Sequence, residues 1–279
     1  MKRKKLTAIL MTAALAGVMV FGCGSNSADE ENTKNTSADA QDEEKEEPVE
    51  LLIAAAASLE YSYEDELIPM FEEENPGITV KGTYDSSGKL QTQIEEGIEA
   101  DVFMSAATKQ MNVLSEESLV DKDSVVNLLE NKIVLITSVD SGLELSDFTD
   151  ITKAETIAIG DPASVPVGQY SEEALTNLGL WEEVSAKASL GTNVTEVLNW
   201  VAEGSADAGI VYATDAATTD KVKVVAEAPA DSLTEPAIYP VGVVTASANK
   251  EAAQKFVEFL QSEEAIKVFE EYGFIQYNE

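Results

Sequence analysis

From residue 51 onward, short runs of apolar residues alternate with segments in which apolar residues recur at helical spacing. Runs such as LLIAAA and IVLI are typical of strands covered on both faces of a sheet. Apolar residues between 194 and 201 occupy the i, i+3, i+4 and i+7 positions of one helix face. The pattern predicts strands at 51–56, 78–84, 101–105, 133–137, 156–159, 208–212, 222–226 and 239–245.

The helical pattern is clearest near the end of the chain, where residues 251–271 predict one or two helices that end near Gly273. Another helical stretch follows Leu59, and Pro69 lies within it. Because proline lacks a backbone N–H, we expect a kink or an early end there. The alternation of strands and helices predicts an α/β body over residues 51–279, which is long enough for one large domain or two lobes.

The first residues have the pattern of a secretory signal. Basic residues at positions 2–5 precede an apolar run at 6–21, which is too short for a stable membrane-spanning helix. The run ends at Cys23, the only cysteine of the chain, so no intramolecular disulfide can form. Cys23 could be an ordinary small residue near a cleavage site. Its placement favours a lipobox, in which residues 1–22 are removed and Cys23 is acylated.

Residues 23–50 are acidic and almost free of large apolar side chains. Such a segment buries too little apolar surface to offset the entropy of ordering, so we expect a disordered tether between the membrane and the folded body. The whole chain carries a formal net charge of −34. Nucleic acid is therefore excluded as a partner by repulsion, and anionic lipid is disfavoured for the folded body.

Two absences limit the chemistry further. The chain has no histidine, and its one arginine, Arg3, lies in the predicted signal. The mature chain therefore lacks histidine-dependent nucleophilic catalysis, imidazole metal ligands and a guanidinium clamp for anions. We expect neither catalysis nor a cofactor. An anion would have to be bound by neutral groups: hydroxyls, backbone N–H groups and helix N-termini.

Ligands of open α/β sheets bind beyond the carboxyl ends of strands, where helices begin. Ser58 and Ser87 each lie at such a junction, and each could offer a hydroxyl and a backbone N–H to an anion. Both are also ordinary N-cap residues, so one such serine is weak support. Tyr212 ends the strand AGIVY, where packing is the alternative role.

Two further junctions leave backbone N–H groups free. Val167 follows a loop restricted by two prolines, close to the next predicted helix start. Val194 follows Asn193, which together with Glu196 resembles a capping box.

The order of the motifs carries a family resemblance that covers residues 50–275. AAASL alone is shared with other oxyanion and iron receptors, whereas GDPASVPVGQY with a downstream GIVY is more specific. Together they resemble the periplasmic molybdate-binding proteins of ABC importers. The matching segments, in order, are AAASL, SSGKLQTQIEEG, ADVFMSA, IGDPASVPVGQYSEEAL, GTNVTEVL, AGIVY, KVKVV, YPVGVV and YGF.

The resemblance implies a type II periplasmic-binding-protein fold, in which two α/β lobes joined by two crossovers surround a ligand cleft. Lobe 1 is expected at 51–134 plus 236–279, and lobe 2 at 135–235. The family holds a molybdate or tungstate dianion with neutral donors only. Carried over by motif, these donors are the hydroxyl and N–H of Ser58 and Ser87, the N–H of Val167 and Val194, and the hydroxyl of Tyr212.

The implied partners are an ABC permease with its ATPase and, through Cys23, the extracytoplasmic face of the cell membrane. The protein is expected to be a monomer. Val167 stands where the family often has a smaller residue, which affects the shape of the pocket and leaves the N–H contact available. Thr195 stands where relatives are frequently basic.

Alternatives remain open at this point. A receptor mainly for tungstate or sulfate has the same donors, and only cavity size separates these ions. An iron receptor is disfavoured by the absence of histidine and by a single well-placed tyrosine. A secreted serine hydrolase would need a base and a G-x-S-x-G elbow, and the sequence has neither. A structural or adhesive lipoprotein would not need the series of strand-end motifs.

Overall fold

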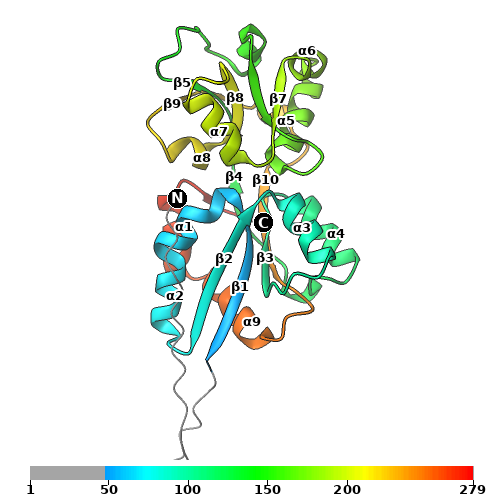
Figure 1. The fold of residues 1–279 in the computed structure, drawn as a ribbon, viewed down its shortest axis with the longest axis vertical. Helices are drawn as coiled ribbons and strands as arrows, with labels where there is room; N and C mark the ends of the chain where they lie inside the picture. Colours follow the sequence, from blue (N-terminus) through cyan, green and yellow to red (C-terminus); the bar gives the residue numbers. More distant parts are fainter. Residues whose placement is uncertain (1–47, 279) are drawn as a thin grey trace, which may run out of the picture. The chain divides into compact units, whose positions relative to one another are not determined.

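The computed structural model describes residues 48–278. The predicted signal, Cys23 and the tether up to residue 47 lie outside the described residues. The strands form two separate sheets, each flanked by helices (Figure 1). The mixed α/β class predicted from the sequence is confirmed. The six-stranded sheet and its helices are called lobe 1 below, and the five-stranded sheet and its helices lobe 2.

The sheet of lobe 1 has the strand order β11-β4-β10-β3-β1-β2. Its β1, β2 and β3 are parallel, and β10 runs antiparallel to β3 and β4. The strands are β1 (Val49–Ala56), β2 (Ile78–Asp85), β3 (Val102–Met104), β4 (Val126–Asn131), β10 (Ala237–Val243) and β11 (Ile275–Gln276). The helices are η1 (Ala57–Leu59), α1 (Glu60–Ser62), η2 (Tyr63–Leu67), α2 (Ile68–Glu74), α3 (Ser87–Glu95), α4 (Thr108–Glu116), η3 (Lys122–Ser124), α9 (Lys250–Phe259) and α10 (Glu263–Glu271).

The sheet of lobe 2 has the order β7-β6-β8-β5-β9, with β5 antiparallel to both of its neighbours. Its strands are β5 (Ile133–Ser138), β6 (Ile157–Gly160), β7 (Ala188–Gly191), β8 (Ala208–Tyr212) and β9 (Val222–Glu227). Its helices are η4 (Phe148–Lys153), α5 (Pro166–Asn177), α6 (Trp181–Ser185), α7 (Val194–Ala202) and α8 (Ala213–Ala217). The chain enters lobe 2 between β4 and β5 and returns to lobe 1 between β9 and β10, through η5 (Ala230–Ser232).

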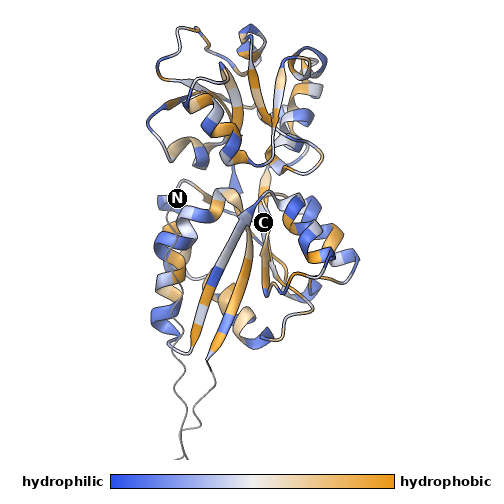
Figure 2. Ribbon diagram, in the orientation of Figure 1, coloured by the Kyte–Doolittle hydropathy of each residue, from blue (hydrophilic) through white to orange (hydrophobic). Residues whose placement is uncertain are grey.

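Apolar periodicity explains the helix faces. Val197, Leu198 and Val201 of α7 are buried, as their spacing predicted. In Figure 2 the helices alternate hydrophilic and hydrophobic patches along their length. Within residues 48–278, no helix combines the length and hydropathy needed to cross a bilayer.

The prediction at Pro69 was partly right. The helical stretch after Leu59 does not end early, because α1, η2 and α2 follow one another as far as Glu74. Its irregularity takes the form of a π-helical turn over η2, in which the N–H of Ile68 reaches the carbonyl of Tyr63. The wider turn lies directly before Pro69, the residue that has no N–H to donate.

One buried acid remains poorly compensated. Asp215 of α8 is 5% exposed, and one of its carboxylate oxygens has no hydrogen-bond partner among the described residues. Burial raises the pKa of Asp215 from 3.8 to about 7, although the backbone N–H groups of Tyr212 and of Asp215 itself act in the opposite direction. Ionisation is therefore disfavoured in the folded protein relative to the unfolded chain. Neutral Asp215 therefore contributes to the stability of the folded protein. This contribution is complete below the unfolded pKa of 3.8 and is lost as the pH rises through the folded pKa of about 7.

We therefore expect Asp215→Asn to raise the free energy of unfolding by about 2–4 kcal/mol at about pH 8 and to change it little at about pH 4. Urea denaturation at a series of pH values measures this difference. Asp220→Asn, at an exposed position of the same segment, is the control and should show no such pH dependence. An equal gain for Asp215→Asn at both pH values would contradict the assignment.

Candidate functional site

All five predicted site residues line one small cavity between the lobes. Its volume is about 10 Å³ in this closed structure, about the space that one water molecule needs. Lobe 1 contributes Ser58 from η1 and Ser87 from α3, and lobe 2 contributes Val167, Val194 and Tyr212. The structure thus brings together residues up to 154 positions apart, from the ends of strands in both sheets.

Helix N-termini supply free backbone donors to this cavity. Ser87 and Val194 are the first residues of α3 and α7, and Val167 is the second residue of α5. The first N–H groups of a helix have no intrahelical acceptor and lie at its positive end. Ser58 occupies the corresponding place in the short helix η1. Four N–H groups are therefore available to an anion.

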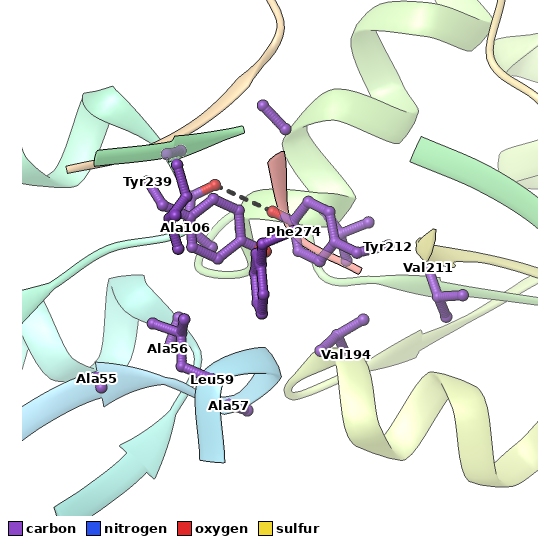
Figure 3. Close-up of a cluster of buried hydrophobic side chains, with 14 of the residues drawn as sticks. Ala55, Ala56, Ala57, Leu59, Ala106, Val194, Val211, Tyr212, Tyr239 and Phe274 are labelled. Atoms are coloured by element: carbon purple, nitrogen blue, oxygen red, sulfur yellow. Dashed lines mark hydrogen bonds between the residues drawn. The ribbon is translucent and has the colours of Figure 1, made fainter. Parts of the chain in front are cut away.

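Small side chains make the space for a ligand. Ala56, the last residue of β1, and Ala57, the first residue of η1, line the cavity, opposite Val194 of lobe 2 (Figure 3). The alanine run, which predicted a buried strand, therefore also places only methyl side chains where this strand ends at the cavity. A larger side chain at either alanine would fill the space next to Ser58.

The Ser87 hydroxyl is oriented by the backbone. Its Oγ accepts a hydrogen bond from the N–H of Ala106 at 3.0 Å, and the side chain is fully buried. An N–H can only donate, so the hydroxyl proton of Ser87 is left for another acceptor. Ser87 is therefore arranged to donate to a ligand.

Tyr212 already has a partner across the cleft. Its hydroxyl donates to the carbonyl oxygen of Ala106 at 3.1 Å (Figure 3). Burial raises the pKa of Tyr212 well above its ordinary value, so the phenol stays protonated at neutral pH. To bind an oxyanion, the Tyr212 hydroxyl would have to give up its hydrogen bond to the Ala106 carbonyl and donate to the ligand instead.

Two lining residues were missed by the sequence analysis. Ser86 is 4% exposed, and its Oγ has no hydrogen-bond partner among the described residues. Asp85 places a carboxylate beside the cavity, where it pairs with Lys89 at 3.1 Å and accepts the N–H of Ser86 at 2.8 Å. The i, i+4 spacing of Asp85 and Lys89 was a visible signal of this pairing. The lysine compensates the acid, so the carboxylate repels an anion less than it would alone.

Direct contacts join the two sides of the cavity. The N–H of Gly88 in lobe 1 donates to the carbonyl of Ser164 in lobe 2 at 2.9 Å. Gln110 of α4 donates its amide to the amide oxygen of Gln169 of α5 at 3.2 Å. A Cβ at Gly88 would overlap the backbone of Ser164, so this approach requires glycine. The structure is that of a closed cleft.

The chemistry available here is hydrogen-bond donation. No lysine or arginine is among the residues that line the cavity, and no group of potential metal ligands occurs within residues 48–278. Helix N-termini and hydroxyl protons are complementary to an anion with several bare oxygen atoms.

Comparisons with known proteins agree with this geometry. The family model for bacterial extracellular solute-binding proteins matches residues 51–275. The chain is 38% identical to Bacillus subtilis YvgL, named as a candidate ABC transporter substrate-binding lipoprotein, over 97% of this chain and 98% of YvgL. It is 41% identical to the molybdate-binding protein ModA of Haemophilus influenzae, over 73% of this chain and 82% of that protein.

Solved structures extend the comparison. The substrate-binding domain of a candidate molybdenum ABC transporter from Clostridium difficile is 42% identical, with a TM-score of 0.64 over 82% of this chain and all of that chain. The periplasmic molybdate-binding protein of Azotobacter vinelandii has a TM-score of 0.72 over 82% of this chain and all of that chain, at 23% identity, which shows the fold. The predicted periplasmic-binding-protein fold and the resemblance read from the motifs are confirmed. The chain belongs to the bacterial extracellular solute-binding protein family.

Proposed function

We propose that this protein is the extracytoplasmic receptor of an ABC importer and captures molybdate between its two lobes. One observation carries the proposal: four helix-start N–H groups and three hydroxyls surround a cavity that no cationic side chain lines. The names of the relatives, among them molybdate-binding proteins, support the choice of oxyanion. Tungstate has the same charge and tetrahedral shape and is the second expected ligand.

Neutral donors are sufficient for a dianion. Burying an unpaired charge is prohibitive, but a hydrogen bond to a charged acceptor is roughly twice as strong as a neutral one. Seven such bonds support binding in the micromolar range or better, about −8 kcal/mol. A site that only donates also rejects an oxyanion carrying a proton, because that O–H would face another hydrogen. Phosphate is therefore disfavoured relative to molybdate.

We further propose how the receptor is attached and assembled. Cys23 carries the lipid anchor, and the tether, expected over residues 23–50, leads from it to β1, which already begins at Val49. The expected lobe bounds, 51–134 plus 236–279 and 135–235, are shifted in this proposal so that β1 from Val49 belongs to lobe 1 and the whole of β5 from Ile133 belongs to lobe 2. The receptor acts as a monomer that delivers its ligand to a membrane permease with its ATPase, and it catalyses no reaction. The lipoprotein name of the B. subtilis relative supports the anchor.

The serine hydroxyls are tested by removing them. Ser58→Ala and Ser87→Ala should each weaken molybdate binding about 10–150-fold, the equivalent of about 1.5–3 kcal/mol for a bond to a charged group. Tyr212→Phe should have a smaller effect, because its hydroxyl gives up the Ala106 carbonyl when it binds the ligand. Val167→Ala should be mild, since only its N–H is needed. Isothermal titration calorimetry with molybdate, tungstate and sulfate gives these affinities.

Ser62→Ala is the matched control, because Ser62 is buried and its hydroxyl donates to the carbonyl of Leu59 at 2.9 Å, within its own helical segment. If both cavity-serine variants bind molybdate as tightly as the wild type, the site is wrongly placed. Tighter binding of sulfate than of molybdate would assign the receptor to sulfate.

Closure is tested at Gly88. Gly88→Ala lies in the first turn of α3, where alanine stabilises a helix by up to about 1 kcal/mol relative to glycine. The added Cβ would meet Ser164 when the cleft closes. We therefore expect at least about tenfold weaker molybdate binding without a loss of stability in the free protein. Calorimetry and thermal melting measure the two quantities, with Gly142→Ala, which has open space, as the control. Wild-type affinity in Gly88→Ala would show that the closed contact is not needed for binding.

A further inference from the structure

Behind Ser58, a chain of buried polar groups leads away from the cavity toward the crossover between the lobes. The hydroxyl oxygens of Ser58 and Tyr239 are 3.0 Å apart. The Tyr239 hydroxyl also lies 3.2 Å from Nδ2 of Asn131, the last residue of β4, and Nδ2 lies 2.8 Å from the Thr214 hydroxyl. Tyr239 is fully buried, and Asn131 and Thr214 are at most 6% exposed. We call Asn131, Tyr239 and Ser58 the relay.

The direction of the Asn131 hydrogen bonds in the relay follows from one fixed donor. The backbone N–H of Lys132 donates to Oδ1 of Asn131 at 2.8 Å, which settles which end of the amide is which. Nδ2 of Asn131 must then donate to both Tyr239 and Thr214. The Tyr239 oxygen is thus an acceptor for Asn131. Oγ of Ser58, at 3.0 Å, is one acceptor within reach of the Tyr239 proton, and at this distance either hydroxyl can donate. The Tyr212 hydroxyl, which also interacts with Tyr239, is the other.

The consequence lies at the cavity. With Tyr239 donating to Ser58, the Ser58 proton does not point back along the relay and is free to face a ligand. We propose that Tyr239, oriented by Asn131, is a positioning residue that fixes Ser58 as a donor and thereby selects oxyanions without a proton. The inference rests on the proposed function, in which Ser58 contacts the oxyanion.

The relay explains a selectivity that a serine alone does not provide. A free hydroxyl rotates and can either donate or accept, so it would tolerate a hydrogen phosphate O–H as well as a bare oxygen atom. When the Ser58 proton points into the cavity, a ligand O–H at this position would place its hydrogen against the hydrogen of Ser58, and no hydrogen bond could form. A buried polar group left unpaired in this way is expensive.

Reversing the polarity of the relay tests the proposal. Asn131→Asp keeps the shape of the side chain, but an ionised carboxylate can only accept. In this variant Tyr239 would donate to the new carboxylate at position 131, and Ser58 would turn its proton toward Tyr239 and present a lone pair to the cavity. The ratio of the Kd for hydrogen phosphate to the Kd for molybdate should fall at least about tenfold at about pH 8. Both ligands are then mainly dianions, so the repulsion from the new charge cancels in the ratio.

Calorimetry gives the Kd for molybdate, and displacement by phosphate gives the second constant. Asn127→Asp, at an exposed position of the same strand, adds the same charge outside the relay and should leave the ratio unchanged. Tyr239→Phe breaks the relay, so adding Asn131→Asp to it should no longer lower the ratio. Tyr63→Phe, which removes another fully buried hydroxyl in lobe 1, should leave the ratio at its wild-type value.

The outcomes separate the two proposals. If Ser58→Ala and Ser87→Ala both bind molybdate like the wild type, the proposed site is wrong. If Ser58→Ala alone does so, the site stands and the relay is overturned. If Ser58→Ala weakens binding while folded Asn131→Asp keeps the wild-type ratio, the site stands and the relay is overturned. A fall in the ratio that persists in the Tyr239→Phe background would also overturn the relay, because the effect would then pass through space.

Discussion

A doubly charged anion leaves water only if its lost hydration is replaced, and no cationic side chain lines the cavity proposed to hold it. Its donors are backbone N–H groups at helix starts and hydroxyls at strand ends, and these groups have fixed directions. The arrangement therefore depends on where the strands end. Ser58 and Ser87 reach the cavity because β1 and β2 end side by side, in register from Val49 and Ile78 to Ala56 and Asp85. In lobe 2, the ends of β6, β7 and β8 likewise bring Val167, Val194 and Tyr212 to the opposite side of the cavity.

Much of this could be predicted from the sequence, because apolar runs and helix-start residues are local signals. The strands predicted from LLIAAA and IVLI are interior strands of the two sheets, each paired on both sides, as β1 and β5. The short edge strand β7 was missed, because an edge strand needs little apolar surface and its Leu190 is half exposed. The Asn193 cap was predicted and is present, with Oδ1 accepting the N–H of Glu196 at 2.9 Å. The Glu196 carboxylate departs from the expected capping box by accepting the N–H of Thr192.

What the sequence could not provide are pairings between distant residues. Nothing near Tyr239 in the chain indicates that its hydroxyl lies beside Ser58, since the two are 181 residues apart. The same holds for Asn131, whose partners Thr214 and Tyr239 are 83 and 108 residues away. The unpartnered hydroxyl of Ser86 was equally hidden, because a serine before a helix normally caps it and this one does not. Local pattern thus located residues that line the cavity, whereas the orientation of their side chains depends on tertiary contacts.

The contact between Tyr212 and Ala106 bears on unloading, the step that follows capture. A receptor that holds its cargo only with buried donors would leave those donors unsatisfied when the cargo departs, which makes release slow. Here the Ala106 carbonyl lies 3.1 Å from the Tyr212 hydroxyl and offers it a partner in the empty cleft. The same residue, through its N–H, keeps Ser87 in place when no ligand is bound. In the closed cleft, the Ala106 carbonyl thus competes with an anion for the Tyr212 hydroxyl, and this competition limits how tightly the cargo can be held.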